Sequence, residues 1–208
     1  MSSSQASVSY SESRRTFLKA APIAATTVVF ADGWLPLHGA ARPAVPADSA
    51  IDSKHMRDLA AWTALTMSTP NPVPFGAEIV HNKNSERLVR ALNAVFPQSD
   101  PSAHAEVHTI RLACNMLKKT SLAGYTLYTT CEPCPMCMAC ALWSGLDRVV
   151  YGATIADAAR YTHQIMIPAA ELVKRSDMAC VVDGPVEHEA CLALFTNPKM
   201  QKTFAKWK

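Results

Sequence analysis

The sequence has little excess charge, and its interior has no long apolar run. Its 20 lysines and arginines against 17 acidic residues give a net charge of +3, which is too weak to indicate a nucleic-acid partner by itself. No interior run is long and clean enough for a membrane span. Hydrophobic residues reach 49%, which excludes a disordered or low-complexity chain. The 208 residues therefore suit one domain of ordinary size with an apolar core.

The number of cysteines is odd. The seven cysteines argue against a simple framework of paired disulfides. Four of them recur every third residue, at Cys131, Cys134, Cys137 and Cys140, and this spacing is compatible with metal binding. The cysteines therefore have to be interpreted together with the residues around them.

The first 47 residues are predicted to be an export signal and a linker. Residues 13–19 read SRRTFLK and precede an apolar stretch over 20–30, which resembles the twin-arginine export signal of bacteria. The resemblance implies recognition by the twin-arginine export machinery, cleavage after Ala41 or Ala47, and a periplasmic protein. An uncleaved membrane anchor and a cytoplasmic terminal helix stay open. Removing residues 1–47 takes away four basic and two acidic residues, so the net charge falls from +3 to +1.

Residues 48–208 are predicted to alternate between helices and strands. The helices follow from apolar residues at helical spacing, and the strands from short β-branched or aromatic runs between turn signals. Pro133 and Gly145 are expected to mark the start and the end of one helix. The order of elements predicts an α/β sandwich. Predicted helices cover 55–68, 104–117, 134–144, 169–174 and 187–196, and predicted strands cover 75–80, 88–92, 126–129 and 148–151.

Two short motifs carry the chemistry. The first contains His104 and Glu106, and the second contains Cys134 and Cys137. The two cysteines share one face of the predicted helix, at whose start the thiolate form is favoured. One histidine and two thiolates leave the fourth position of a zinc ion open for water, as in catalytic sites. Glu106 lies two residues from the histidine, so it can carry protons without binding the metal.

In combination, this H-x-E…P-C-x-x-C arrangement resembles the zinc-dependent cytidine and nucleobase deaminase superfamily, over roughly residues 72–160. The resemblance implies a three-layer α/β/α cytidine-deaminase-like sandwich with a central mixed sheet, formed by a catalytic domain over 48–208. It implies one Zn²⁺ per chain on His104, Cys134 and Cys137, with Glu106 as the catalytic residue. It also implies a homodimer.

The sequence around the motifs is most similar to guanine deaminases and tRNA adenosine deaminases. Asn93, eleven residues before His104, stands where that group places an asparagine that hydrogen-bonds the base. Backbone groups of Gly76, Ala77 and Ala105 are predicted to contact the same small-molecule nucleobase or nucleoside, a purine of the guanine type.

One segment departs from the guanine-deaminase pattern. Those enzymes carry an additional acidic residue after the strand predicted here at 148–151, whereas residues 158–170 contain none. Guanine itself is therefore in doubt. A tRNA adenosine editor stays open, although the nearly neutral domain makes a nucleic-acid partner less favoured.

Non-deaminase alternatives also stay open. A zinc-stabilised binding protein on the same scaffold and a thiol redox protein are two of them. An iron–sulfur cluster on the four regularly spaced cysteines is disfavoured, because a helix turns Cys131 and Cys140 away from the other two. Two further expectations concern side chains near the site: Glu132 is expected to bond backbone N–H groups, and Phe204 and Trp207 are expected either to reach an active site or to pack on the core.

Overall fold

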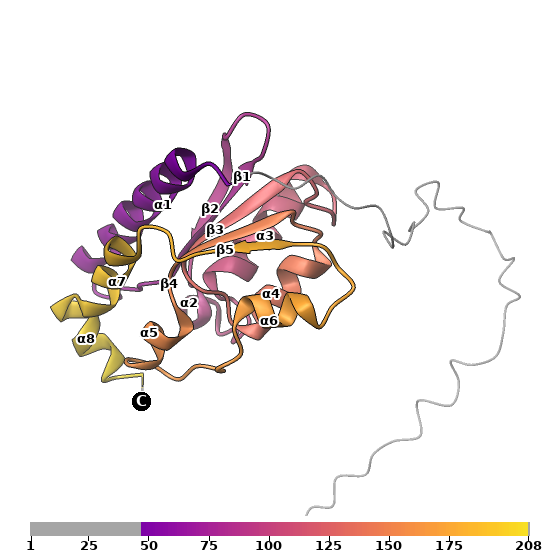
Figure 1. The fold of residues 1–208 in the computed structure, drawn as a ribbon. Helices are drawn as coiled ribbons and strands as arrows, with labels where there is room; N and C mark the ends of the chain where they lie inside the picture. The colour runs from indigo at the N-terminus through magenta and orange to yellow at the C-terminus, as the bar shows by residue number, and fades with distance from the viewer. Residues whose placement is uncertain (1–46, 208) are drawn as a thin grey trace, which may run out of the picture. The chain divides into compact units, whose positions relative to one another are not determined.

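The computed structural model describes residues 47–207 (Figure 1). The predicted export signal, with its linker up to residue 46, lies outside the described residues. Within 47–207, none of the helices combines the length and the apolar character that crossing a membrane requires. The strands are β1 (Gly76–His81), β2 (Arg87–Leu92), β3 (Tyr125–Cys131), β4 (Arg148–Ala153) and β5 (Val181–Asp183). The helices are α1 (Ser49–Ala64), the 3₁₀ turn η1 (Leu65–Ser68), α2 (Val95–Gln98), α3 (Ala105–Leu117), α4 (Pro135–Trp143), α5 (Ile155–Ala159), α6 (Ala169–Lys174), α7 (His188–Thr196) and α8 (Pro198–Phe204).

The five strands form one mixed sheet in the order β2-β1-β3-β4-β5. β1 pairs antiparallel with both β2 and β3, whereas β3, β4 and β5 run parallel. Parallel neighbours need a crossover, and α4 supplies it between β3 and β4. The prediction of a central mixed sheet is confirmed.

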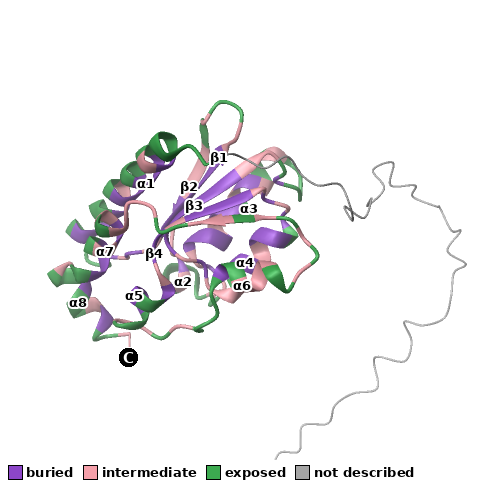
Figure 2. Cartoon of the chain, viewed as in Figure 1, coloured by how far each residue is buried: buried purple, intermediate pink, exposed green. Residues whose placement is uncertain are grey.

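Helices cover both faces of the sheet, as Figure 1 shows. Ile79, Leu127 and Val149 are register partners and pack with α3, α4 and α6. The next residues along the central strands, Tyr128 and Val150, pack with α1, α7 and α8 on the other face. This alternation follows from the two-residue period of a strand. It buries both faces of the central strands β1, β3 and β4, shown mostly in purple in Figure 2, and completes the three-layer sandwich.

A buried ionic group joins α1 to the sheet. Asp52 accepts two hydrogen bonds from the guanidinium of Arg148, at 2.7 and 2.8 Å, and one from the Tyr128 hydroxyl at 2.7 Å. Burial raises the pKa of Asp52, but these bonds outweigh it, and the pKa is lowered. Because all three residues are at most 3% exposed, the carboxylate depends on its partners for solvation.

Most predicted elements are present, with two instructive differences at helix starts. α1 begins at Ser49 rather than at residue 55, because the Asp48 side chain accepts hydrogen bonds from the N–H groups of Ala50 and Ile51. Asp100, followed by Pro101 and Ser102, resembles a helix start in the sequence, but no helix of residues 47–207 begins there. The Asp100 carboxylate instead closes a turn by accepting from the N–H and hydroxyl of Ser102, and α3 begins at Ala105.

Candidate functional site

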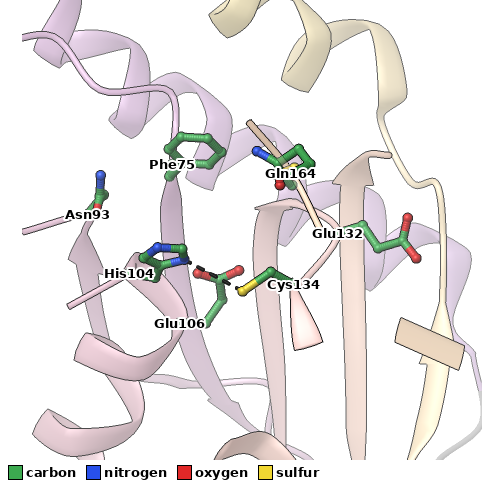
Figure 3. A pocket seen from close by; sticks show the side chains of 8 residues that line it. Phe75, Asn93, His104, Glu106, Glu132, Cys134 and Gln164 are labelled. Atoms are coloured by element: carbon green, nitrogen blue, oxygen red, sulfur yellow. Dashed lines mark hydrogen bonds between the residues drawn. The ribbon is translucent and has the colours of Figure 1, made fainter. Parts of the chain in front are cut away.

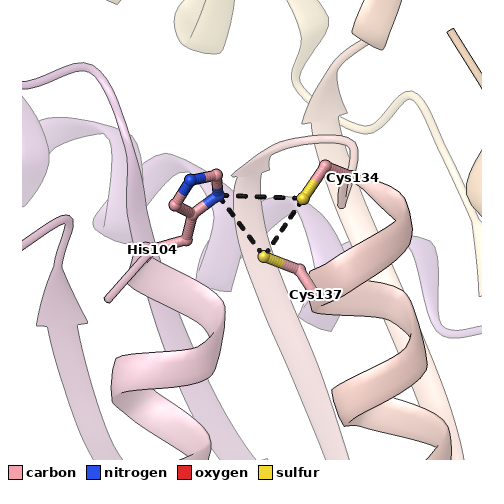
Figure 4. A group of neighbouring side chains, drawn as sticks. All are labelled: His104, Cys134 and Cys137. Carbon is pink, nitrogen blue, oxygen red and sulfur yellow. Dashed lines mark hydrogen bonds between the residues drawn. The ribbon is translucent and has the colours of Figure 1, made fainter. Parts of the chain in front are cut away.

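The site lies where two helices begin. His104 is the N-cap residue of α3 and Cys134 is the N-cap residue of α4, which has Pro135 at its first position. Both residues have extended backbone, and Cys137 follows in the first turn of α4. α3 and α4 pack side by side on the same face of the sheet. The two motifs, 30 residues apart, thus meet in space (Figure 4).

The three donor atoms form a compact triangle. The Nδ1 atom of His104 lies 3.7 Å from the Sγ atom of Cys134 and 3.6 Å from that of Cys137, and the two sulfurs are 3.5 Å apart. Tetrahedral zinc with bonds of about 2.0–2.3 Å places neighbouring donors roughly 3.5–3.8 Å apart. The donor set and its spacing therefore fit zinc.

The two thiols have opposite acidities. The hydrogen bond from Cys137, followed by the bond with His104, lowers the pKa of Cys134 to about 4, despite partial burial. The thiol of Cys137 keeps its proton, because the bond to Cys134 and burial both raise its pKa. A divalent cation bound by both sulfurs would displace the remaining thiol proton.

Glu106 lies beside this triangle. It is 5% exposed, and burial raises its pKa to about 7 although the nearby His104 acts in the opposite direction. Figure 3 shows its carboxylate between His104 and Cys134. A carboxyl group in this position can hold or release a proton near neutral pH.

A cavity of about 50 Å³ opens over these groups, whereas one water molecule needs about 10–15 Å³. The cavity therefore admits more than a single water. Asn93 and Gln164 face it from opposite sides, with Phe75 above (Figure 3). Its lining consists of Phe75, Asn93, His104, Glu106, Cys131, Glu132, Cys134 and Gln164.

Comparison with known proteins agrees with this geometry. The family model for the cytidine and deoxycytidylate deaminase zinc-binding region matches residues 50–153, which is half of the chain. The chain belongs to the cytidine and deoxycytidylate deaminase family. The match includes both motifs and β1 to β4. The chain therefore contains a zinc-binding deaminase domain, and His104, Cys134 and Cys137 are the group among its described residues that could hold the zinc.

Curated relatives of this deaminase domain include a guanine deaminase and tRNA-specific adenosine deaminases. Guanine deaminase of Bacillus subtilis is 45% identical over 86 residues, or 41% of this chain and 54% of the relative. The tRNA-specific adenosine deaminase of Agrobacterium fabrum is 36% identical over 99 residues, or 48% of this chain and 64% of the relative. The chain thus spans little more than half the length of the curated relatives it matches.

Solved structures agree on the deaminase fold. A structure from a study of A-to-I editing by tRNA:A34 deaminases has a TM-score of 0.58 and 26% identity, and the match covers 68% of this chain and 99% of that one. A structure of guanine deaminase from Nitrosomonas europaea has a TM-score of 0.62 and 20% identity, over 74% of this chain and 84% of that one. The cytidine-deaminase-like sandwich predicted from the sequence is confirmed.

Around the deaminase site, Glu132 has the structural role predicted for it. Its two carboxylate oxygens accept hydrogen bonds from the N–H of Ile155, at 3.1 Å, and the N–H of Ala169, at 2.9 Å. These two residues are the first of α5 and α6. One side chain at the cavity wall thus fixes the starts of two helices.

The predicted backbone contacts lie next to the cavity rather than in its lining. The Gly76 N–H donates to the Thr130 hydroxyl at 3.0 Å, and a Cβ atom on Gly76 would come within 2.2 Å of the Thr63 hydroxyl oxygen. Close packing against α1 therefore accounts for this glycine. Ala77 and Ala105 are fully buried. Contact of these three residues with a substrate stays a prediction.

The flanking cysteines do not join the metal triangle. Among residues 47–207, the group of possible ligand atoms within 4.8 Å of one another consists of His104, Cys134 and Cys137. Burial raises the pKa of Cys131 and of Cys140. Cys131 nevertheless lines the cavity, at the end of β3.

The C-terminal aromatics pack on the core of their own chain. Phe204 is 3% exposed and stacks on Tyr161 with ring centroids 5.7 Å apart. Trp207 meets Phe204 edge-on at 5.3 Å. Of the two roles expected for these residues, the structure describes core packing.

Gln164 was missed by sequence reasoning. It lies in the segment between α5 and α6, where no periodicity or motif marks it. The one available signal was negative: residues 158–170 lack the acid of the guanine-deaminase pattern.

Proposed function

We propose that this protein is a zinc-dependent hydrolytic deaminase that converts the amino group of a nucleobase or nucleoside into a carbonyl and releases ammonia. One observation carries the proposal: the donor atoms of His104, Cys134 and Cys137 lie 3.5–3.7 Å apart, next to the buried Glu106 carboxylate and under a cavity. Three protein ligands are typical of catalytic zinc, whereas structural zinc has four.

The metal ligands and Glu106 have different roles in the proposed reaction. Held by His104 and the two cysteines, zinc would act as a Lewis acid that lowers the pKa of water. The Glu106 carboxylate accepts a proton from water as the water oxygen bonds to the amino-bearing ring carbon, and it passes this proton to the adjacent ring nitrogen. It then transfers the second water proton to the amino group as the carbon–nitrogen bond breaks, so an amino-heterocycle and water give an oxo-heterocycle and ammonia.

A purine of the guanine type is the first candidate substrate. The 45% identity to guanine deaminase of Bacillus subtilis supports it, as does the carboxamide of Asn93 at the cavity wall. Backbone groups of Gly76, Ala77 and Ala105 complete the proposed contacts.

Editing of adenosine in tRNA is the second candidate. The match to the tRNA:A34 deaminase structure, which covers 99% of that chain, favours it. An anticodon stem-loop RNA therefore belongs among the substrates to be tested.

The test is ammonia release from the purified chain with guanine, adenine, cytosine, their nucleosides, a pterin and the stem-loop RNA. Zinc content is measured on the same sample, and Glu106→Gln is the control. Release that is lost in Glu106→Gln while zinc is retained supports a deaminase and identifies its substrate. One zinc per chain without any turnover would instead indicate a non-catalytic zinc-stabilised binding protein.

We further propose that the chain is exported by the twin-arginine machinery to the periplasm and acts there as a homodimer. The SRRTFLK motif at 13–19 and the apolar stretch over 20–30 support export. Replacing Arg14 and Arg15 by lysine should retain the protein in the cytoplasmic fraction, and sedimentation should give twice the chain mass. A cleaved, soluble product would exclude a membrane anchor.

A further inference from the structure

We propose that Gln164 is a specificity-determining residue whose side-chain amide hydrogen-bonds to the ring edge of the substrate. This inference rests on the proposed deaminase function and narrows its substrate class. The substrate it selects is an uncharged amino-heterocycle that offers both a hydrogen-bond donor and an acceptor on the edge facing Gln164.

The position of Gln164 suits this role. Its side chain lines the cavity on the side opposite Asn93, with His104, Glu106 and Cys134 below them in the view of Figure 3. Within residues 47–207, the Gln164 carboxamide makes no hydrogen bond. Its donor and acceptor are therefore available to a molecule in the cavity.

Both ends of the segment that carries Gln164 are anchored. On one side, Tyr161 stacks on Phe204 with ring centroids 5.7 Å apart. On the other side, the N–H of Ala169 donates to Glu132 at 2.9 Å. Because these contacts hold the segment before a ligand arrives, a hydrogen bond from Gln164 costs little ordering entropy.

The charges around the cavity explain why an amide matters. Two carboxylates line the cavity: Glu132 already accepts two backbone hydrogen bonds, and Glu106 lies beside the metal ligands. The other two polar side chains above them, Asn93 and Gln164, are neutral amides, each with N–H donors and a C=O acceptor. An amide can orient a ring but cannot act as an acid or a base. Proton transfer is therefore left to Glu106, and an uncharged ring fits best.

The experiment measures binding separately from turnover. Calorimetry on the zinc-loaded full chain carrying Glu106→Gln gives the Kd of guanine, adenine, cytosine, their nucleosides and a pterin. Adding Gln164→Ala should weaken binding of the preferred ligand about 5- to 10-fold, the equivalent of one hydrogen bond. Adding Gln164→Glu should make binding pH-dependent, with weaker binding as the new carboxyl ionises above about pH 4–5.

The matched control is His163→Ala, at the exposed neighbouring position on the same segment. It should leave Kd within about 2-fold. In the active chain, Gln164→Ala should raise KM while kcat changes little, because the bond is made to the substrate before and during reaction. Circular dichroism and thermal melting establish that each variant is folded.

The possible outcomes separate the two proposals. If a base binds in a Gln164-dependent way but the unmodified chain releases no ammonia, the inference holds and the deaminase function fails. The inference is overturned if Gln164→Ala and Gln164→Glu leave Kd and KM unchanged, or if His163→Ala weakens binding as much. It is also overturned if no compound binds.

Discussion

His104 and Cys134 occupy equivalent positions at the starts of two neighbouring helices. Each precedes the first helical residue, with φ −60° and ψ 156° for His104 and φ −64° and ψ 166° for Cys134. The positive ends of α3 and α4 therefore converge on one point. A helix N-terminus favours negative charge, so this arrangement stabilises the Cys134 thiolate before a metal binds.

The first prediction concerns the metal ligands. Cys137→Ala should abolish stoichiometric zinc binding, because two protein ligands remain. Cys140→Ala, one turn further along α4, should keep one zinc per chain, because Cys140 lies outside the donor triangle. Elemental analysis of the purified variants measures this. Loss of metal from Cys140→Ala or Cys131→Ala would revive the iron–sulfur or thiol redox alternatives.

The second prediction concerns the buried carboxylate on α1. Asp52→Ala should destabilise the fold by about 2–4 kcal/mol, because it leaves two N–H groups of the buried Arg148 guanidinium unpaired while its Nε keeps the bond to Asp183. Asp58→Ala is the matched control on the same helix. Its ion pair with Lys54, at 2.8 Å, is exposed and should contribute at most about 0.5 kcal/mol. Urea denaturation gives both values, and equal losses would contradict the assignment.

The third prediction concerns pH. His188 Nε2 lies 2.7 Å from Asp157 Oδ2. Burial raises the pKa of Asp157, but the bonds from His188 and Thr154 bring it down to about 2, from an ordinary value of 3.8. The same contact raises the pKa of His188 above 6.5, against some desolvation.

The sign of the effect follows from these shifts. The contribution of Asp157 is fully present above pH 3.8 and is lost as the pH falls toward 2. The contribution of protonated His188 is fully present below pH 6.5 and is lost as the pH rises through its raised pKa. His188→Ala should therefore cost roughly 1 kcal/mol at pH 5.5 and less at pH 9. Urea denaturation at both pH values measures this, with His163→Ala, at an exposed position, as the control. A cost that grows with pH would contradict it.

The fourth prediction separates packing from substrate contact at Gly76. Gly76→Ala should destabilise the fold by about 1–3 kcal/mol, because the new methyl group meets the Thr63 side chain at 2.2 Å. In a Thr63→Ala background the same substitution should cost much less. A double-mutant cycle of unfolding free energies measures the coupling. If Gly76→Ala weakened substrate binding and left stability unchanged, contact with the substrate would be the better explanation.

The sequence was informative wherever local pattern decides structure. Apolar periodicity located the two helices that carry the ligands and the strands that precede them. Gly145 follows the end of α4 as predicted, whereas the proline at its first position is Pro135 and the predicted Pro133 lies before the N-cap. The metal site was predictable because both motifs are short and each sits at a helix start.

Local pattern failed where an element is short or depends on its surroundings. β5 has three residues at the sheet edge, and its Val181 is 38% exposed. The segment is therefore too short to show the alternation of apolar and polar residues that predicts a strand. Asp100 is a residue type that often caps helices, but its carboxylate accepts hydrogen bonds from the N–H of Ser102 and from the Arg111 guanidinium. Gln164 reaches the cavity only because folding brings the segment between α5 and α6 over the metal ligands. No pattern in the residues around Gln164 predicts that this segment lies over the cavity.

The double hydrogen bond of Glu132 has a consequence for how the proposed substrate contacts are distributed along the chain. Because the starts of α5 and α6 are fastened to one carboxylate, the stretch between Ile155 and Ala169 forms a closed loop with a fixed base. Gln164 lies within this loop, whereas the donor triangle is carried by the starts of α3 and α4 outside it. The contact proposed for Gln164 therefore lies on a segment without metal ligands, whereas the contacts proposed for Asn93 and Ala105 lie before and at the start of α3.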